Sequence, residues 1–244
     1  TSIKNYTWIS KVNGDGSYLM ILTKNKKKQI EGLDLEKSYP VLEAVKLIKE
    51  KKYVKFDESV EVSINTGIDS KQSDQNVRGS FVPPHGLGKK VEIAVFAQGK
   101  NADDAKSLGV KRVGGDDLIS SLQEKIDVDV IIATPDMMAV VSKIAKILGP
   151  KGLMPNPKTG TVTNDIKNTI ENINKGLVAY KNDKAGTIHA AVGKVSFEEN
   201  QLSENINSFI EEIKKTKPSG LKGNFINSIF VSSTMGFGLK VEIS

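Results

Sequence analysis

The 244-residue sequence contains no cysteine and only two histidines, His85 and His189. The lack of cysteine excludes a disulfide framework, a zinc site built from thiolates and a cysteine nucleophile. Two histidines leave little material for a metal centre or a Ser/His triad. No apolar run approaches the ~18 residues that a membrane-spanning helix needs, and no signal or transit peptide is visible. We therefore expect no metal, no cofactor and no membrane partner.

Arginine is also scarce, with two residues among the 35 Lys and Arg, against 29 Asp and Glu, for a net charge of +6. The basic surface therefore consists of lysine ammonium groups and lacks guanidinium forks. A surplus of six charges indicates an anionic partner only weakly. With 38% hydrophobic residues the chain is too apolar to be intrinsically disordered, and its length is ample for one or two cores.

The two ends of the chain share one hydrophobic pattern, in which apolar and polar residues alternate. In residues 59–66, Val60, Val62 and Ile64 alternate with polar residues, which is typical of a strand with one solvated face. The other elements predicted for these ends are a helix over 40–52, a hairpin of 177–181 and 187–192, a helix that a capping box at 196–199 opens and Pro218 ends, and strands over 225–232 and 239–243. Together they predict an α+β unit.

The middle of the chain has a different pattern, in which short apolar strands alternate with helices. The predicted strands are 91–96, 110–113 and 128–134, and the predicted helices are 101–109 with Asn101 as N-cap, 116–126, 135–148 and 164–175. Alternation of this kind is typical of a parallel sheet with right-handed crossovers.

These two sequence patterns predict a fold class: an α+β split domain that contains both chain termini, with an inserted α/β three-layer parallel-sheet domain. The predicted parts are an N-terminal extension over 1–39, a split domain of 40–87 and 177–244, and an insert over 88–176. Two backbone crossings without a long linker favour a hinge, for which the candidate residues are Gly86, Gly88 and Gly176.

Three segments have no clear chemistry. The Lys-rich extension 1–39 could be an arm that contacts nucleic acid or a solvated leader. Residues 149–160 contain three Pro and three Gly, which favours either a rigid interaction surface or a stiff connector. The basic turn at 85–90 lacks the spacing of a phosphate-binding loop and precedes a strand, whereas such loops follow one.

A series of motifs in fixed order identifies a family. The motifs cover residues 55–60, 67–69, 73–79, 84–89, 133–136, 148–163, 188–189, 193–194, 217–218, 222–223 and 233–236. In this order they closely resemble the large-subunit ribosomal protein one family, here the L-one family, over residues 40–243.

The resemblance implies a non-enzymatic component of the large ribosomal subunit with the split fold described above. Its expected partners are large-subunit ribosomal RNA, which it binds to form the mobile stalk at the exit site, and the deacylated tRNA that leaves there. A further expected partner is the protein's own mRNA, whose translation it would repress. A protein present once in each particle is not expected to form a homo-oligomer.

The resemblance also implies which residues form the RNA surface. The RNA-binding residues carried over in this way are Lys55, Phe56, Glu58, Ser59, Lys71, Asp183, Lys184, His189, Ser233, Thr234, Met235 and Gly236. Lysine can meet phosphate, an aromatic ring can stack on a base, and short polar side chains can meet 2′-hydroxyls. Residues 183, 184 and 189 are expected to neighbour the 233–236 segment. In one departure from the family, Ser70-Lys71-Gln72 replaces a proline followed by two basic residues, which removes one positive charge.

Two further expectations concern location and an alternative function. The Lys-rich bias, the absence of an initiator Met and alphaproteobacterial-like segments favour a mitochondrial matrix protein, with bacterial cytoplasm or a plastid as alternatives. The alternative function is a nucleotide-binding enzyme built on the α/β insert. That function requires a phosphate-cradling loop after the first strand of the insert, where residues 96–100 supply only one glycine, Gly99.

Overall fold

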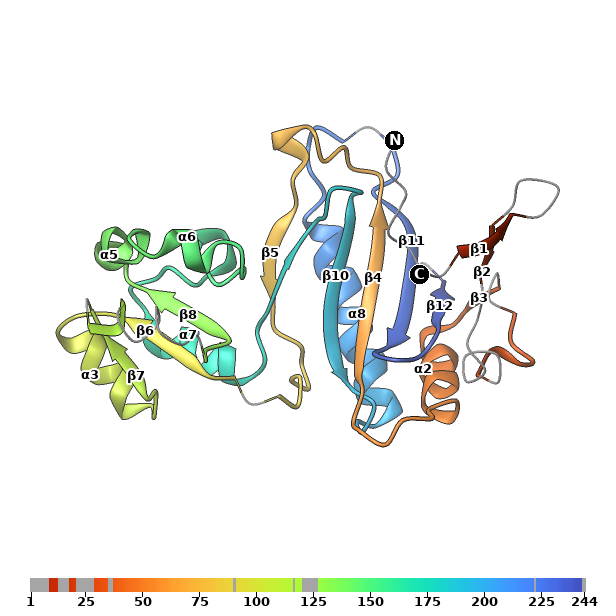
Figure 1. Cartoon of the computed structure of the whole chain (residues 1–244), viewed down its shortest axis with the longest axis horizontal. Coiled ribbons are helices and arrows are strands. Elements are labelled where there is room, and N and C mark those ends of the chain that lie inside the picture. Colours follow the sequence, from red (N-terminus) through yellow and green to blue (C-terminus); the bar gives the residue numbers. More distant parts are fainter. Residues whose placement is uncertain are drawn as a thin grey trace.

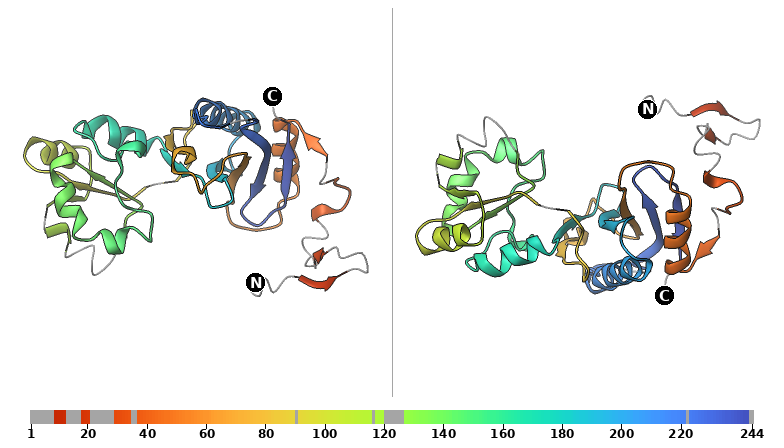
Figure 2. Two further views of the ribbon diagram at one scale, coloured as in Figure 1. Left: turned by 90° about the horizontal axis from the view of Figure 1, so that it is seen from above. Right: turned by 90° about the horizontal axis from the view of Figure 1, so that it is seen from below.

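The computed structural model describes residues 9–12, 18–20, 29–34, 37–89, 91–115, 117–119, 127–221 and 223–242 (Figure 1). In this part of the chain the secondary structure is mixed α and β, with four sheets. The elements form two groups, each with its own buried side chains, and two backbone segments connect the groups (Figures 1 and 2).

The first group is built on a five-stranded sheet with the order β10-β4-β11-β12-β3. Its strands are β3 (Ser38–Tyr39), β4 (Ser59–Thr66), β10 (Thr187–Lys194), β11 (Ile226–Ser233) and β12 (Gly238–Val241). Neighbouring strands are antiparallel except for β12 and β3, which are parallel. The range predicted for β4 is confirmed, and strict alternation of buried and solvent-facing residues runs along it.

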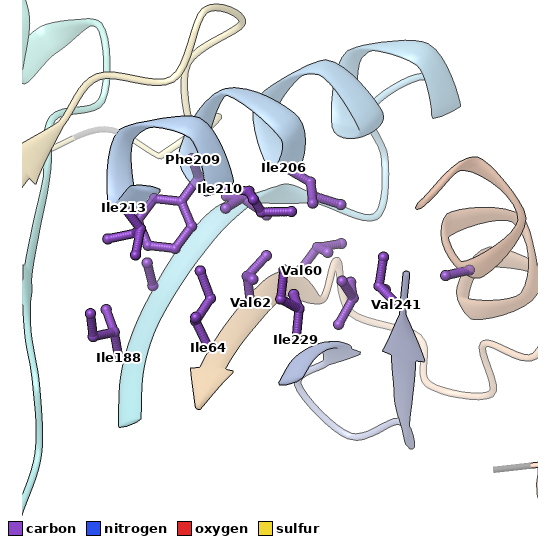
Figure 3. Close-up of a cluster of buried hydrophobic side chains, with 14 of the residues drawn as sticks. Val60, Val62, Ile64, Ile188, Ile206, Phe209, Ile210, Ile213, Ile229 and Val241 are labelled. Atoms are coloured by element: carbon purple, nitrogen blue, oxygen red, sulfur yellow. The ribbon is translucent and has the colours of Figure 1, made fainter. Parts of the chain in front are cut away.

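Two helices, α2 (Val41–Glu50) and α8 (Glu199–Lys215), pack on one face of this sheet. Along α8 the buried residues Leu202, Ile206, Phe209, Ile210 and Ile213 recur at helical spacing and meet the inward side chains of β4, β10 and β11 (Figure 3). Burial of each such side chain contributes about 1.5–3 kcal/mol. The opposite face carries most of the polar residues of these strands, together with the exposed ring of Phe230.

A separate two-stranded ribbon connects this group with the middle of the chain. Its antiparallel strands are β5 (Arg78–Phe81) and β9 (Val178–Lys181). Two aromatic side chains hold the ribbon on α8, because the rings of Phe81 and Tyr180 lie 5.3 Å and 5.8 Å from the ring of Phe209.

The ribbon overturns the predicted hairpin of 177–181 and 187–192. The turn exists, with a bridge from Asn182 to Ile188 and a bond from the Asp183 amide to the Thr187 carbonyl at 2.8 Å, but all four residues of β9 pair with β5. The aromatic contacts of the ribbon with α8 are long-range, so a local turn pattern cannot reveal the true strand partner.

The second group is a three-stranded parallel sheet with the order β7-β6-β8. The strands are β6 (Ile93–Phe96), β7 (Arg112–Gly114) and β8 (Val130–Ala133), and the helices around them are α3 (Lys100–Ser107), α5 (Met138–Ser142), α6 (Ala145–Leu148) and α7 (Ile166–Asn174). Every residue of β6 is buried, as expected for a strand covered on both faces. One cluster of buried side chains includes α5 and α6, and a second includes α3 and α7.

Short 3-10 helices complete the described elements and correct one prediction. They are η1 (Ser73–Gln75), η2 (Pro135–Met137) and η3 (Pro157–Thr159). The single helix predicted over 135–148 is wrong, because η2, α5 and α6 divide that range and the helix breaks at Ile144 (φ −107°, ψ 10°). The Ser142 hydroxyl donates to the Met138 carbonyl at 2.7 Å just before the break, a competing bond that favours bending.

Two predicted N-caps are also wrong. The N-cap of helix α3 is Gly99, two residues before the expected Asn101. Helix α8 has Glu198 as its N-cap, in a capping box with Gln201, because the Ser196 hydroxyl donates to the Asp57 carboxylate instead.

The extension 1–39 lies largely outside the described residues, as does the helix predicted over 116–126. The described part of the extension holds the strand pair β1 (Ile9–Val12) and β2 (Tyr18–Met20). It also holds β3, which belongs to the five-stranded sheet, so residues 38 and 39 are part of the first group.

Candidate nucleic-acid interface

The structure joins two segments of the predicted RNA surface that lie 175 residues apart in sequence. The Ser59 amide donates to the Thr234 hydroxyl at 3.0 Å, and the Thr234 amide donates to the Ser59 carbonyl at 3.1 Å. These bonds extend the pairing of β4 with β11, which ends at Ser233 and Val60. The start of β4 and the turn after β11 therefore form one continuous surface, called here the turn site and made of residues 55–59 and 233–236.

Glu58 shapes the turn from beneath. Its side chain is 1% exposed, and one carboxylate oxygen accepts from the Ser233 hydroxyl at 3.1 Å and from the Met235 amide at 2.9 Å. The Gly236 amide closes the turn on the Ser233 carbonyl, and a Cβ at position 236 would collide with the Ser233 hydroxyl. Glu58 and Ser233, two of the residues expected from the family to contact RNA, both have buried side chains and support the turn from inside.

The exposed part of the turn site combines apolar and polar groups. Phe56 is 51% exposed and Met235 is 44% exposed, although both are large apolar side chains. Lys55 and Thr234 are exposed in the same two segments. Exposed apolar side chains beside a cation and a hydroxyl suit a partner with planar rings, hydroxyls and phosphates.

Sequence reasoning missed Lys194 as a member of this surface. Its Nζ donates to the Ser59 hydroxyl at 2.9 Å and to the Asp57 carbonyl at 3.5 Å. The pairing of β10 with β4 sets Lys194 opposite Ser59. The Gly193-Lys194 motif contributed to the family resemblance, but its place beside residue 59 depends on a long-range strand register that no local pattern reveals.

A second set of predicted residues lies at the other end of β4. One oxygen of the Asp183 carboxylate accepts from the Thr187 and Ala185 amides, both at 2.8 Å. These backbone bonds, that of Thr187 above all, lower the pKa of Asp183. The Ser70 hydroxyl donates to the Lys184 carbonyl at 2.5 Å, which links this turn to the loop that carries Lys71.

The two sets do not meet. Thr187 pairs with Asn65, six residues along β4 from Ser59, which corresponds to about 20 Å at the rise of a strand. The expectation that Asp183 and Lys184 neighbour the 233–236 segment is therefore wrong. His189 lies between the two ends, where its Nδ1 is 3.0 Å from the Ser63 hydroxyl and its Nε2 is 3.9 Å from Asp183.

The three predicted hinge glycines lie on the two backbone segments that connect the groups, called here the first crossing (residues 85–89) and the second crossing (residues 176–178). All three have positive φ: +70° at Gly86, +66° at Gly88 and +98° at Gly176. A Cβ on Gly176 would lie 2.8 Å from the Leu87 amide nitrogen, and one on Gly86 would lie 3.0 Å from the Lys175 carbonyl oxygen. Glycine is required at both positions because the crossings approach each other at backbone distance.

Nothing in the described residues favours the alternative of a nucleotide-binding enzyme. The loop after β6 reaches α3 through Gly99, and the first turn of α3 carries Asp103, whose charge opposes a phosphate there. Across the described ranges there is no cluster of three metal-ligating side chains, and no helix in them is long and apolar enough to cross a bilayer.

Comparisons with known proteins identify the family of this chain. The model of the ribosomal protein L1p/L10e family matches residues 47–237. Proteins named "Large ribosomal subunit protein uL1" from Coxiella burnetii and Alcanivorax borkumensis are each 50% identical over 91% of this chain and 96% of their own length. A protein of the same name from Proteus mirabilis is 49% identical over 91% of this chain and 95% of its own length.

These relatives come from bacteria, so the mitochondrial expectation finds no support and the alternative of a bacterial cytoplasm fits better. The family model and the relatives both cover most of the sequence. The chain belongs to the ribosomal protein L1p/L10e family, whose members are proteins of the large ribosomal subunit and not enzymes.

Proposed function

We propose that the chain binds a folded element of large-subunit ribosomal RNA through the turn site and forms a mobile stalk that assists release of deacylated tRNA. The observation that carries this proposal is the pair of bonds between Ser59 and Thr234, which build one exposed surface from two distant segments. The relatives are named as proteins of the large subunit, which supports RNA as the partner.

The chemistry of the turn site fits folded RNA. Such RNA is recognised through its shape, its 2′-hydroxyls and unstacked bases. The exposed ring of Phe56 can stack on a base, and Met235 can pack on a sugar or a base face. The Thr234 hydroxyl can meet a 2′-hydroxyl, while Lys55 and Lys194 supply positive charge for phosphates.

The swing of the stalk rests on the proposed division into two domains. We assign residues 38–87 and 177–244 to the RNA-binding domain, 88–176 to the insert and 1–37 to an extension, because β3 places residues 38–39 in the sheet of the RNA-binding domain. The separate clusters of buried side chains support this division. Rotation of the insert about the two crossings would let the stalk close on tRNA and release it.

The protein's own mRNA is a further proposed partner. An mRNA that mimics the ribosomal element would occupy the same turn site, so the two RNAs would compete for it. Repression of translation therefore requires no second binding surface. Residues Lys71, Asp183, Lys184 and His189 are proposed as secondary contacts, because they lie at or toward the opposite end of β4.

A salt-series binding titration tests the proposal. The ligands are a bulged stalk-type ribosomal RNA hairpin and a fully paired RNA of equal length. We expect tight binding that is selective for the hairpin and that Thr234→Val and Met235→Ala each weaken by about 10-fold or more. Thr169→Val and Met138→Ala in the insert are matched controls and should bind as the wild type does.

Equal and steeply salt-dependent binding of both RNAs would mean that the protein offers only a generic basic surface. That result would refute the proposal that the turn site recognises folded RNA.

A further inference from the structure

A buried asparagine of α8 holds the first crossing in place through hydrogen bonds to its backbone. Asn205 of α8 is fully buried. Its side-chain oxygen accepts from the His85 amide at 3.1 Å, and its side-chain nitrogen donates to the Gly86 carbonyl at 3.2 Å and to the Val192 carbonyl at 2.8 Å. One amide group therefore fastens two consecutive residues of the crossing to the helix and to β10.

Two neighbouring contacts also hold the first crossing against α8 and the turn that precedes it. Glu204, the residue before Asn205, lies 2.6 Å from the Nε2 of His85. A Cβ on Gly88 would lie 2.8 Å from the ring of Phe197, which packs against the core of the first group. Residues 85–88 of the crossing thus lie against α8 and its preceding turn.

The next residue along the chain is held by the insert. Lys89 donates to the Asp129 carboxylate at 2.7 Å, and the other oxygen of that carboxylate accepts from the Glu92 amide at 3.2 Å. The change of attachment on the first crossing therefore falls between Gly88 and Lys89.

The second crossing shows an equally sharp boundary. The Gly176 and Leu177 amides donate to the carbonyls of Ile173 and Asn172 and so cap α7. Leu177 packs against the core of the insert, whereas Val178 packs against the core of the first group and pairs with Phe81. The boundary on this crossing is the Leu177–Val178 bond.

We propose that Asn205 is a positioning residue that fixes the direction in which the first crossing leaves the RNA-binding domain. Rotation of the insert is then confined to Gly88–Lys89 and Leu177–Val178. Of the three predicted hinge glycines, Gly86 belongs to the segment 85–88 that is held against α8, and Gly176 belongs to the cap of α7. Without Asn205 this segment is held less firmly, and the insert samples a wider range of positions. The inference rests on the proposed function only in assigning a purpose to the motion.

Single-molecule energy transfer tests this proposal directly, because the absence of native cysteine permits two specific labels. Lys106→Cys in α3 and Glu211→Cys in α8 place one dye on each group, at exposed positions. In Asn205→Ala we expect the fraction of molecules outside the main peak of transfer efficiency to rise about tenfold, equivalent to about 1.4 kcal/mol for the two lost bonds to the crossing.

Two controls separate positioning from general destabilisation. Ile206→Val removes a methylene from the next residue of α8, which is fully buried and makes no side-chain hydrogen bond to the crossing. This variant should leave the fraction of molecules outside the main peak unchanged. Hairpin affinity should be the same in Asn205→Ala and the wild type, because the turn site does not involve the crossing. An unchanged distribution in Asn205→Ala, or equal broadening in Ile206→Val, overturns the proposal.

Amide hydrogen exchange in the wild-type protein provides a test that needs no folded variant. The His85 amide, bonded to Asn205, should exchange at least about tenfold more slowly than the Lys89 amide after correction for sequence effects. Equal rates would overturn the proposal even if Asn205→Ala failed to fold. Loss of RNA binding would instead refute the proposed function and leave both of these results standing.

Discussion

Replacement of Glu58 gives the sharpest test of how the turn site is built. Glu58 is buried, and a single oxygen of its carboxylate receives the Ser233 hydroxyl and the Met235 amide. Glu58→Ala would leave both donors without that partner in a site closed to water. Each unsatisfied buried donor costs about 1–3 kcal/mol, and the space vacated by the side chain adds to this. We expect Glu58→Ala to lose about 3–5 kcal/mol of unfolding free energy.

Glu58→Gln keeps the shape of the side chain and an oxygen that can accept both bonds. A hydrogen bond to a charged group contributes about 1.5–3 kcal/mol, and a neutral one about 0.5–1.5 kcal/mol. We therefore expect a loss of about 1–2 kcal/mol of stability with the turn preserved. Urea unfolding measures the stability, and titration with the hairpin measures the affinity.

The pattern across the two variants decides the role of Glu58. If Glu58 holds the turn, Glu58→Gln should retain hairpin affinity to within about threefold, while Glu58→Ala should lose about 10-fold or more. Glu211→Gln, an exposed change on α8, is the matched control and should alter neither property. A Glu58→Gln variant that is as stable as the wild type but binds RNA as weakly as Glu58→Ala would refute the reasoning, because the carboxylate would then contact RNA itself.

Four further predictions concern other parts of the molecule. Gly176→Ala should cost at least about 1 kcal/mol more than Gly152→Ala by urea unfolding, because both glycines have positive φ but only position 176 meets another backbone; equal costs would contradict the close contact. Lys194→Met should weaken hairpin binding and make the slope of log affinity against log salt shallower by up to about one, whereas an unchanged slope would exclude a phosphate contact. The lowered pKa of Asp183 implies a contribution to stability that is present above the unfolded pKa, about 3.9, and lost as pH falls through the folded pKa; the melting temperatures of wild type and Asp183→Asn should therefore converge at acid pH, and a constant difference would contradict this. A disulfide engineered between the two domains should slow tRNA release from ribosomes without weakening RNA binding, and an unchanged release rate would count against the swing.

Local sequence patterns predicted the elements whose stabilising contacts are also local or strictly periodic. The alternation of residues 59–66 gave β4 its correct bounds, since one face is buried along its whole length. The buried residues of α8 follow the predicted helical spacing. In contrast, the helix over 135–148 was expected to be continuous, because nothing in its apolar pattern signals the break at Ile144.

Features that depend on long-range pairing could not be predicted in the same way. The partner of β9 is set by the packing of Tyr180 on Phe209, a contact between residues far apart in sequence. The candidate site shows the same limit. The family motifs identified residues 55–59 and 233–236 as one surface, but not that Glu58 and Ser233 lie beneath it or that Lys194 joins it.

Sequence patterns also cannot separate two sites that share one strand. Asp183 and Lys184 follow a recognisable turn, and the family resemblance assigned them to the RNA surface. Only the register of β10 on β4 shows that they lie at the opposite end from Thr234. The turn that carries these residues could be predicted from the sequence, but their distance from the turn site could not.

Hydrogen exchange of the full chain with and without the stalk-type hairpin tests the central claim most directly. If the turn site binds RNA, the hairpin should slow exchange most strongly in residues 55–59 and 233–236, with a smaller effect at residues 183–187. Strong protection confined to residues 70–72 and 183–187, with residues 233–236 unchanged, would contradict the account and move the RNA site to the opposite end of β4.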